Sequence, residues 1–237
     1  MTKKLVGTGQ RYDSDTGQFV PCPVKLLPNG YFVREDTFDS SSIRECFRNY
    51  SDIDVSSKVV LDLGANVGGF TKMAVERGAK AVIAVEPCPD NFQILSMNSP
   101  TSTNLNGAVS EHQDGTCEFY YATSKRNSVS SSTSKRRNAS GSSITVNSYN
   151  FKSLLEAYRP QVLKIDIEGK EYDLFDSIDA IPEFVETVAI EFHRTSGRYK
   201  SYPARFFDSS AWEVTEHPVL IFKQSKVFDY TFKRKAV

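Results

Sequence analysis

A chain of 237 residues, 39% of them hydrophobic and 24% charged, is long enough to form one large domain with its own core. Its 29 basic residues balance its 29 acidic ones, and this zero net charge argues against a protein whose main task is to grip nucleic acid. The four cysteines form no C-x-x-C pair, which argues against a disulfide framework and a zinc site. No run of about 18 apolar residues occurs, which argues against a membrane-spanning helix. No apolar signal segment follows residues 1–4, so we expect a cytoplasmic location.

Residues 1–57 are expected to form an N-terminal region that packs on the main domain. Segments 24–27 and 31–33 flank a Pro-Asn-Gly turn, which predicts a hairpin. Residues 37–42 offer Thr, Asp and Ser as N-caps to a helix that carries Ile43 and Phe47.

From residue 58 to residue 237 the sequence alternates between apolar runs and helical spacing. Strands are predicted at 59–63 and 81–86, near 107–109 and 117–121, at 162–169 and 187–193, and around 212–214 and 227–230. Helices are predicted after 69, after 89, at 151–158 and at 172–178. This alternation predicts a Rossmann-like α/β domain, with a mostly parallel sheet and helices on both faces.

Residues 124–143 interrupt this alternation with a long polar loop. Nine of its twenty residues are serine, and Lys125, Arg126, Lys135, Arg136 and Arg137 add five positive charges. Two readings remain open: a solvated, mobile loop, or a lid whose cations hold the phosphate of a nucleotide-linked sugar or a lipid carrier. An RNA substrate is a more distant alternative.

The segment Asp-Leu-Gly-Ala-Asn-Val-Gly-Gly at 62–69 directly follows a buried strand. Glycines there allow a sharp turn and close approach of a ligand to the backbone. Glu86 ends the next strand, where a carboxylate can accept both hydroxyls of a ribose. The candidate cofactor-binding residues are Asp62, Gly64, Ala65, Asn66, Gly68, Glu86, Pro87 and Ala108.

Two cofactors compete for this loop. A dehydrogenase would carry G-x-G-x-x-G facing a pyrophosphate, whereas here Asn66 occupies the second glycine position. Asp62 would repel a pyrophosphate but suits the ammonium and sulfonium groups of S-adenosylmethionine, which we therefore expect as the cofactor. A nucleotide-linked oxidoreductase, a non-catalytic binding domain and a ligand-free tight turn are the alternatives.

Segments 59–68, 85–87, 163–171 and 190–193 together resemble the FkbM-type methyltransferases, and the Lys-Ile-Asp-Ile-Glu-Gly run at 164–169 is the most specific of them. The resemblance covers about residues 24 to 195. It implies a seven-stranded class I methyltransferase fold and methyl transfer to oxygen, commonly on sugars or polyketides. The loop at 124–143 and the aromatic C-terminal tail depart from the family's compact pattern.

A candidate catalytic group lies at the ends of two predicted neighbouring strands. Asp166 and Glu168 are two residues apart, as are Glu191 and His193, so each pair is expected to point to one side. A hydroxyl acceptor needs a positioned base, and we rank Asp166 first, His193 as the rival base and Glu191 third.

Each of these residues also has a structural alternative. Asp166 could bind the methionine amino group or cap a helix, Glu168 could cap or pair with Lys170, and His193 could be a packing histidine. A divalent ion held by the carboxylates is a further possibility, with no metal ligand assigned. The expected activity is O-methylation of a sugar, glycan or related small hydroxylated acceptor. The alternatives are a non-catalytic S-adenosylmethionine-binding domain and a methyltransferase acting on RNA or protein.

Overall fold

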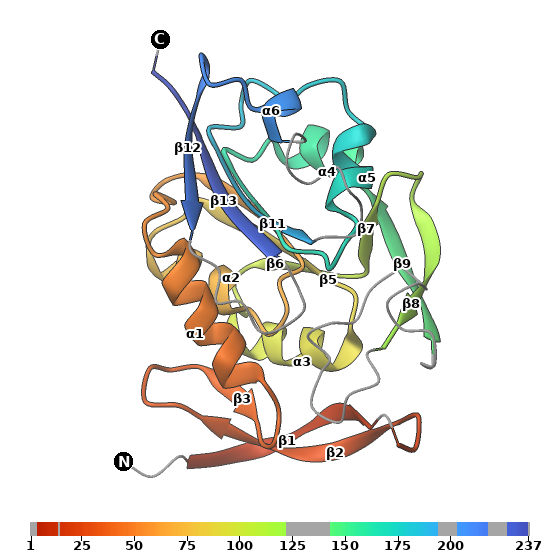
Figure 1. Cartoon of the computed structure of the whole chain (residues 1–237). Helices are drawn as coiled ribbons and strands as arrows, with labels where there is room; N and C mark the ends of the chain where they lie inside the picture. Colours follow the sequence, from red (N-terminus) through yellow and green to blue (C-terminus); the bar gives the residue numbers. More distant parts are fainter. Residues whose placement is uncertain (1–3, 14, 122–142, 194–202, 218–226, 237) are drawn as a thin grey trace.

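The computed structural model describes residues 4–13, 15–121, 143–193, 203–217 and 227–236 (Figure 1). The Ser/Arg-rich loop therefore lies outside the described residues, apart from Ser143, which begins a strand. No helix in the described part of the chain is long and apolar enough to cross a bilayer.

A seven-stranded sheet forms the centre of the molecule (Figure 1). Its strands, in spatial order, are β12 (Trp212–His217), β13 (Val227–Arg234), β11 (Thr187–His193), β10 (Val162–Ile165), β4 (Val59–Leu63), β5 (Ala81–Glu86) and β6 (Thr103–Asn106). β13 is antiparallel to both of its neighbours, β12 and β11, and the remaining neighbouring strands pair in parallel. The predicted mostly parallel, seven-stranded α/β fold is confirmed.

Helices cover both faces of the sheet because the central strands are apolar on both sides. The strands β4, β5, β10 and β11 are buried along almost their whole length, as expected for a parallel sheet between helical layers. One face packs against α1 (Asp39–Tyr50), α2 (Gly69–Glu76) and α3 (Pro89–Asn98). The other packs against α4 (Phe151–Tyr158), α5 (Glu171–Asp176) and the segment around α6 (Pro203–Phe206).

The strand predicted near 107–109 exists but does not belong to the main sheet. The position beside β5 is taken by β6, and the chain then leaves as β7 (Ala108–Ser110). With β9 (Ser143–Asn150) and β8 (Gly115–Tyr120), β7 forms a separate three-stranded sheet in the order β7-β9-β8. Gly107 permits this departure, because a Cβ there would lie 2.6 Å from the Asn147 carbonyl oxygen.

The N-terminal region contains a three-stranded antiparallel sheet. The predicted hairpin around residues 28–30 is confirmed, since β2 (Gln18–Leu26) pairs with β3 (Phe32–Arg34). The sequence did not predict β1 (Lys4–Asp13), which pairs with β2 along most of its length. Its alternation is weak, with two glycines among ten residues.

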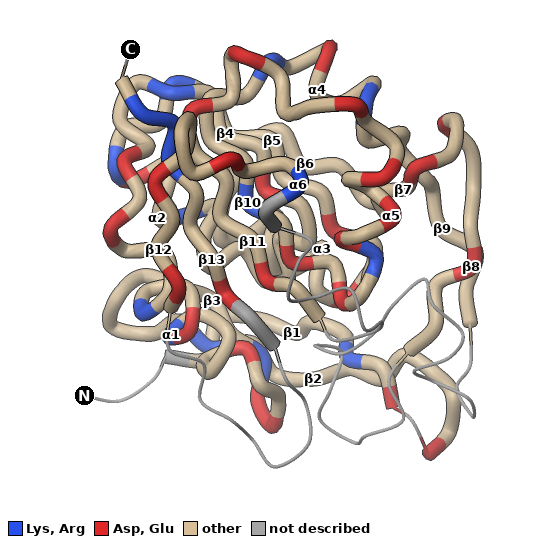
Figure 2. The backbone as a smooth tube through the Cα atoms, turned by 45° about the horizontal axis from the view of Figure 1, so that its top comes forward, with Lys and Arg blue, Asp and Glu red and all other residues tan. Residues whose placement is uncertain are grey.

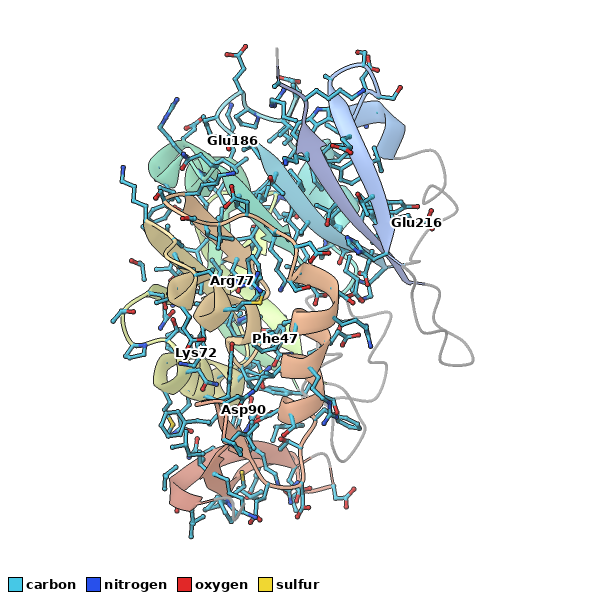
Figure 3. All side chains as sticks on the ribbon, turned by 90° about the vertical axis from the view of Figure 1, so that its left-hand side faces the viewer. Phe47, Lys72, Arg77, Asp90, Glu186 and Glu216 are labelled. Carbon is cyan, nitrogen blue, oxygen red and sulfur yellow. The ribbon has the colours of Figure 1, made fainter. Side chains whose placement is uncertain are left out.

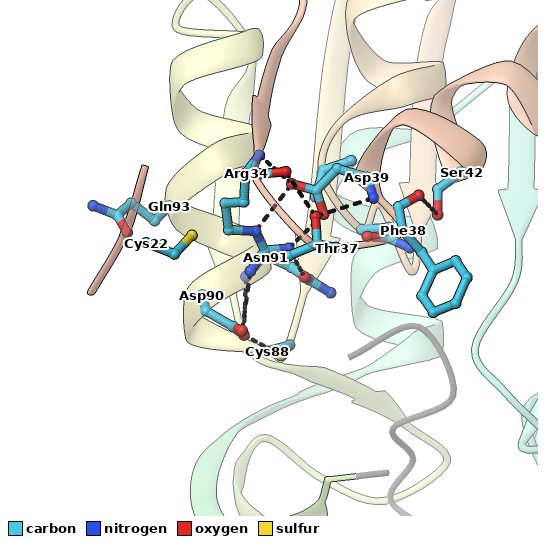
Figure 4. A network of polar contacts seen from close by, with 12 residues as sticks. Cys22, Arg34, Thr37, Phe38, Asp39, Ser42, Cys88, Asp90, Asn91 and Gln93 are labelled. Carbon is cyan, nitrogen blue, oxygen red and sulfur yellow. Dashed lines mark hydrogen bonds and ion pairs between the residues drawn. The ribbon is translucent and has the colours of Figure 1, made fainter. Parts of the chain in front are cut away.

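A buried arginine joins this sheet to α1 and α3 (Figure 4). The Arg34 guanidinium donates to both carboxylate oxygens of Asp39, at 3.0 and 2.8 Å, and its Nη1 lies 3.0 Å from Asp90 Oδ2. Asp90 lies in the first turn of α3 (Figure 3), where it also accepts from the backbone N–H of Tyr12 in β1. The expected side-chain cap of α1 is wrong: Phe38 is the N-cap, and the Asp39 carboxylate binds Arg34 instead.

Candidate functional site

The predicted cofactor loop connects β4 to α2 and lies against the ends of β5 and β10. The N–H groups of Gly64 and Ala65 both donate to the Val85 carbonyl at 3.0 Å. Gly64 has φ +76°, and a Cβ there would lie 1.7 Å from the Asp166 carbonyl oxygen. The glycine is therefore required for close approach between two backbones of the protein.

The second half of the loop is held by α3 and by Tyr31 of the N-terminal region. Gly68 has φ +82° and precedes α2, and a Cβ there would lie 2.9 Å from Leu95 Cδ1. The Asn98 amide donates to the Val67 carbonyl at 2.7 Å, and the Tyr31 hydroxyl donates to the Gly69 carbonyl at 3.1 Å. The loop is therefore fixed from the side of β3 and α3.

Glu86 lies at the end of β5 with only 5% of its surface exposed. Its two carboxylate oxygens accept from the backbone N–H groups of Asn66, at 2.8 Å, and Cys88, at 2.9 Å. Burial raises the Glu86 pKa to about 7, with the Asp90 charge adding to the effect. A carboxylate has about four lone-pair sites, so Glu86 retains the capacity to accept from a ribose.

The other predicted cofactor residues occupy different kinds of position. Pro87 is half-buried between β5 and α3. Ala65 packs with Ala84 and Leu95, and Ala108 packs with Cys88, Phe119, Tyr121 and Val146. Both alanines are buried and provide apolar packing around the loop.

Asp62 is fully buried and its charge is paired inside the protein. Its Oδ2 accepts from the Thr71 hydroxyl at 2.6 Å, and its Oδ1 lies 3.2 Å from Lys164 Nζ. Lys164 also donates to the Gly64 carbonyl at 2.7 Å, so the ion pair with Asp62 is linked directly to the backbone of the loop. Burial opposes the charge of Lys164, but Asp62 and Asp166 outweigh it and raise the lysine pKa. Lys164 gives no sign of this role in the sequence, where it is one residue of a predicted buried strand.

Asp166 and Glu168 do not share a strand, so the alternation expected for them is wrong. β10 ends at Ile165, and the chain then turns through Glu168 at φ +58° and Gly169 at φ +107°. The Glu168 carboxylate nevertheless reaches His193, with its Oε2 3.2 Å from Nε2. Lys170 pairs with Asp173 and Glu111.

Carboxylates surround the buried His193 at the end of β11. Nδ1 lies 2.9 Å from Glu171 Oε1, and Nε2 lies 3.3 Å from Glu191 Oε1 in addition to its contact with Glu168. Burial disfavours a charged imidazole, but Glu168 and Glu171 outweigh it, so the His193 pKa lies well above its usual range. Glu171 was not predicted as a site residue, although it lies within the segment at 163–171.

We refer to Asp166, Glu168, Glu171, Glu191, His193 and Asp229 as the His193 cluster. Ligand atoms of Asp166, Glu191 and His193 all lie within 4.8 Å of one another, so the three predicted catalytic residues are brought together. Burial and the Glu191 charge raise the pKa of Asp166. Glu191 is also desolvated, but the His193 hydrogen bond and charge hold its pKa below the usual range.

Asp229 is a further member that the sequence did not indicate. It lies opposite Glu191 in the β11–β13 register, and the Asn49 amide of α1 donates to its Oδ2 at 2.8 Å. Burial and the Glu191 charge raise the Asp229 pKa to about 7. The cluster therefore combines residues from β11 and β13 with the turn after β10 and the start of α5.

Glu86→Ala is expected to weaken the binding of S-adenosylhomocysteine at least about tenfold, because charge-assisted hydrogen bonds contribute roughly 1.5–3 kcal/mol. Titration calorimetry measures the affinity. Glu118→Ala removes an exposed carboxylate and is the matched control. Unchanged affinity in Glu86→Ala would refute the ribose-binding role.

The pKa of Glu86 also predicts a pH dependence of cofactor binding. The folded-state value of about 7 lies above the ordinary 4.5, so the carboxyl is mostly neutral at pH 6 and mostly ionised at pH 8. Affinity for S-adenosylhomocysteine should fall about tenfold from pH 8 to pH 6, because the ionised form is the better acceptor. Calorimetry on Glu86→Gln should give weaker binding with little change over this range.

Comparisons with known proteins give similarities to solved structures at low sequence identity. M. jannaschii TYW2 in complex with AdoMet is 13% identical, with a TM-score of 0.44 and coverage of 90% of this chain and 83% of that chain. Trm5b from Pyrococcus abyssi is 10% identical, with a TM-score of 0.48 and coverage of 95% and 62%. An rRNA methylase from Streptococcus thermophilus is 10% identical, with a TM-score of 0.44 and coverage of 78% and 90%.

No curated protein matches the chain. The sequence pattern of the methyltransferase FkbM domain, however, matches residues 62–210, which include the cofactor loop, Glu86 and the β10 and β11 ends. This match covers more than half of the chain and includes the segments that carried the resemblance in the sequence, the first of them from Asp62 onward. The protein belongs to the FkbM methyltransferase family.

Proposed function

We propose that the protein transfers a methyl group from S-adenosylmethionine to a hydroxyl oxygen of a sugar, a glycan or a related small hydroxylated acceptor. The observation that carries the proposal is the His193 cluster, which lies next to the cofactor loop. Asp166 belongs to both, because its backbone carbonyl abuts Gly64 while its carboxyl belongs to the cluster. Ligands of open α/β sheets bind at this carboxyl edge of the strands.

The residues at the loop fit the cofactor. Glu86 retains free lone pairs for the ribose hydroxyls, and the negative charge of the cluster suits the sulfonium and ammonium groups. When bound, the cofactor supplies an electrophilic methyl group. The chain's own contribution is to bind the ribose through Glu86 and to hold the acceptor hydroxyl at the cluster.

An alcohol is a poor nucleophile unless its proton is removed as the methyl group moves. A positioned base contributes roughly 10²–10⁴-fold in rate. Asp166 is our first candidate for this role because it is the cluster member that adjoins the cofactor loop. His193 remains the rival, and Glu191 the third candidate. Since carboxylates contact both His193 nitrogens, this residue also orients the acidic groups around it.

The chemistry of the site and the charge of the chain support the proposed acceptor class. Basic and acidic positions are interspersed over the described backbone (Figure 2), which suits a small hydroxylated acceptor better than a polyanion. A non-catalytic cofactor-binding domain would need the loop and Glu86, but it would have no use for a buried cluster of carboxylates around an imidazole.

The test is an incubation of the purified protein with S-adenosylmethionine and a panel of glycans and small hydroxylated compounds. Mass spectrometry should show a mass gain of one methylene on at least one acceptor. RNA and protein are included as separate arms. Methylation confined to either of those arms would contradict the acceptor class, and cofactor binding without transfer to any arm would favour the non-catalytic alternative.

A further inference from the structure

We propose that Asp166, Glu191 and His193 bind a divalent transition-metal cation of the Mn²⁺ type. The inference deepens the proposed function, since the cation would lie where the acceptor hydroxyl is expected. One ligand atom from each residue lies within 4.8 Å of the other two. Adjacent ligands of an ion with bonds of about 2.1 Å lie roughly 3 Å apart, and His193 Nε2 is 3.3 Å from Glu191 Oε1.

The orientation of His193 is the one that metal-binding histidines adopt. Its Nδ1 faces Glu171 Oε1 at 2.9 Å, and Glu171 is fully buried and also accepts from the Gly169 N–H. A carboxylate on one ring nitrogen fixes the ring and increases the basicity of the other. Nε2 is thereby directed at Glu168 and Glu191.

A second observation is a buried carboxylate oxygen without a donor beside Glu191. The Asp229 carboxyl is 5% exposed and contacts that of Glu191, while its Oδ1 has no hydrogen-bond donor among the described residues. Two acceptors that face each other are stable only with a proton or a cation nearby. The nearby Lys164 ammonium is already bound to Asp62 and the Gly64 carbonyl.

The donor set indicates the class of ion. Carboxylate oxygens alone suit Mg²⁺ and Ca²⁺, whereas an added imidazole nitrogen favours ions such as Mn²⁺, Fe²⁺ and Zn²⁺. A cation held here would bind the oxygen of the acceptor hydroxyl and stabilise negative charge on it. This would give the cluster a positioning function in addition to proton removal.

The experiment uses the full-length protein after treatment with a chelator, without S-adenosylmethionine. Titration with Mn²⁺, followed by electron paramagnetic resonance, should show one bound ion per chain. Asp166→Asn, Glu191→Gln and His193→Gln should each weaken binding at least about tenfold. Asp54→Asn and Glu118→Gln change exposed carboxylates in the same way and should bind as the wild type does.

A spectroscopic measurement on the wild type covers the case in which a variant does not fold. The electron spin-echo modulation of bound Mn²⁺ should contain a ¹⁴N coupling from the His193 imidazole. Absence of stoichiometric Mn²⁺ binding, or binding without the nitrogen coupling, would overturn the inference and leave a protonated His193 as the counter-charge. Bound Mn²⁺ without methyl transfer would instead count against the proposed function alone. If chelator-treated protein that binds no Mn²⁺ still transfers methyl groups at the full rate, the metal-site proposal is wrong and the proposed function stands.

Discussion

Asp166→Asn is expected to lower kcat by about 100-fold or more while the protein stays folded and keeps its affinity for S-adenosylhomocysteine. The substitution is nearly isosteric and removes the ionisable carboxyl of a cluster residue whose backbone touches the cofactor loop. Its backbone N–H would still donate to the Leu63 carbonyl, so the contact between β10 and β4 is preserved. Steady-state methyl transfer with the acceptor found by mass spectrometry gives kcat.

Two further variants are needed to interpret a loss of activity in Asp166→Asn. Asp54→Asn makes the same chemical change at an exposed ion pair with Lys58 and should leave kcat unchanged. His193→Gln tests the rival base, and loss of the acidic limb of the pH–rate profile in that variant would identify the histidine. If Asp166→Asn turns over at a near-normal rate, Asp166 is not essential and Glu191 becomes the next candidate.

The type of the central strands and the place of the cofactor loop could be predicted from the sequence because they depend on local patterns. Apolar runs such as 59–63 and 81–86 are buried on both faces, and this alone gives strand type and parallel packing. Gly64 was predicted to be a turn residue. In the structure a side chain at this position would collide with the backbone of Asp166, which lies about one hundred residues further along the chain.

The partners within the site could not be predicted, because they come from segments far apart in the sequence. In the sequence Lys164 is a single charged residue within an apolar strand. Its partner, Asp62 on the neighbouring strand, lies 3.2 Å away and is identified only by the structure. Asp229 becomes a cluster member only through the antiparallel register that sets it opposite Glu191. Glu171 was noted only as the last residue of the family segment at 163–171, although its carboxylate lies against His193.

Arg34 shows how such long-range contacts connect the N-terminal region to the cofactor loop (Figure 4). Its Nη2 donates to Asn91 Oδ1 at 2.7 Å, and the Asn91 Nδ2 lies 3.5 Å from Glu86 Oε1. Arg34 and the carboxylates of Asp39 and Asp90 that it contacts are almost completely buried. The two buried negative charges therefore depend on one guanidinium for their neutralisation.

Arg34→Met is expected to lower the free energy of unfolding by about 3–5 kcal/mol, because it leaves the buried charges of Asp39 and Asp90 without their partner. Urea unfolding followed by circular dichroism measures the change. Arg44→Met makes the same replacement on the exposed face of α1 and should change stability by less than about 0.5 kcal/mol. The Arg34 variant should also bind S-adenosylhomocysteine more weakly at temperatures where it remains folded, because Asn91 loses the donor that orients it toward Glu86. A loss of stability below about 1 kcal/mol would mean that the carboxyls of Asp39 and Asp90 take up protons or water at little cost. The N-terminal sheet would then be held mainly by its apolar contacts with α3.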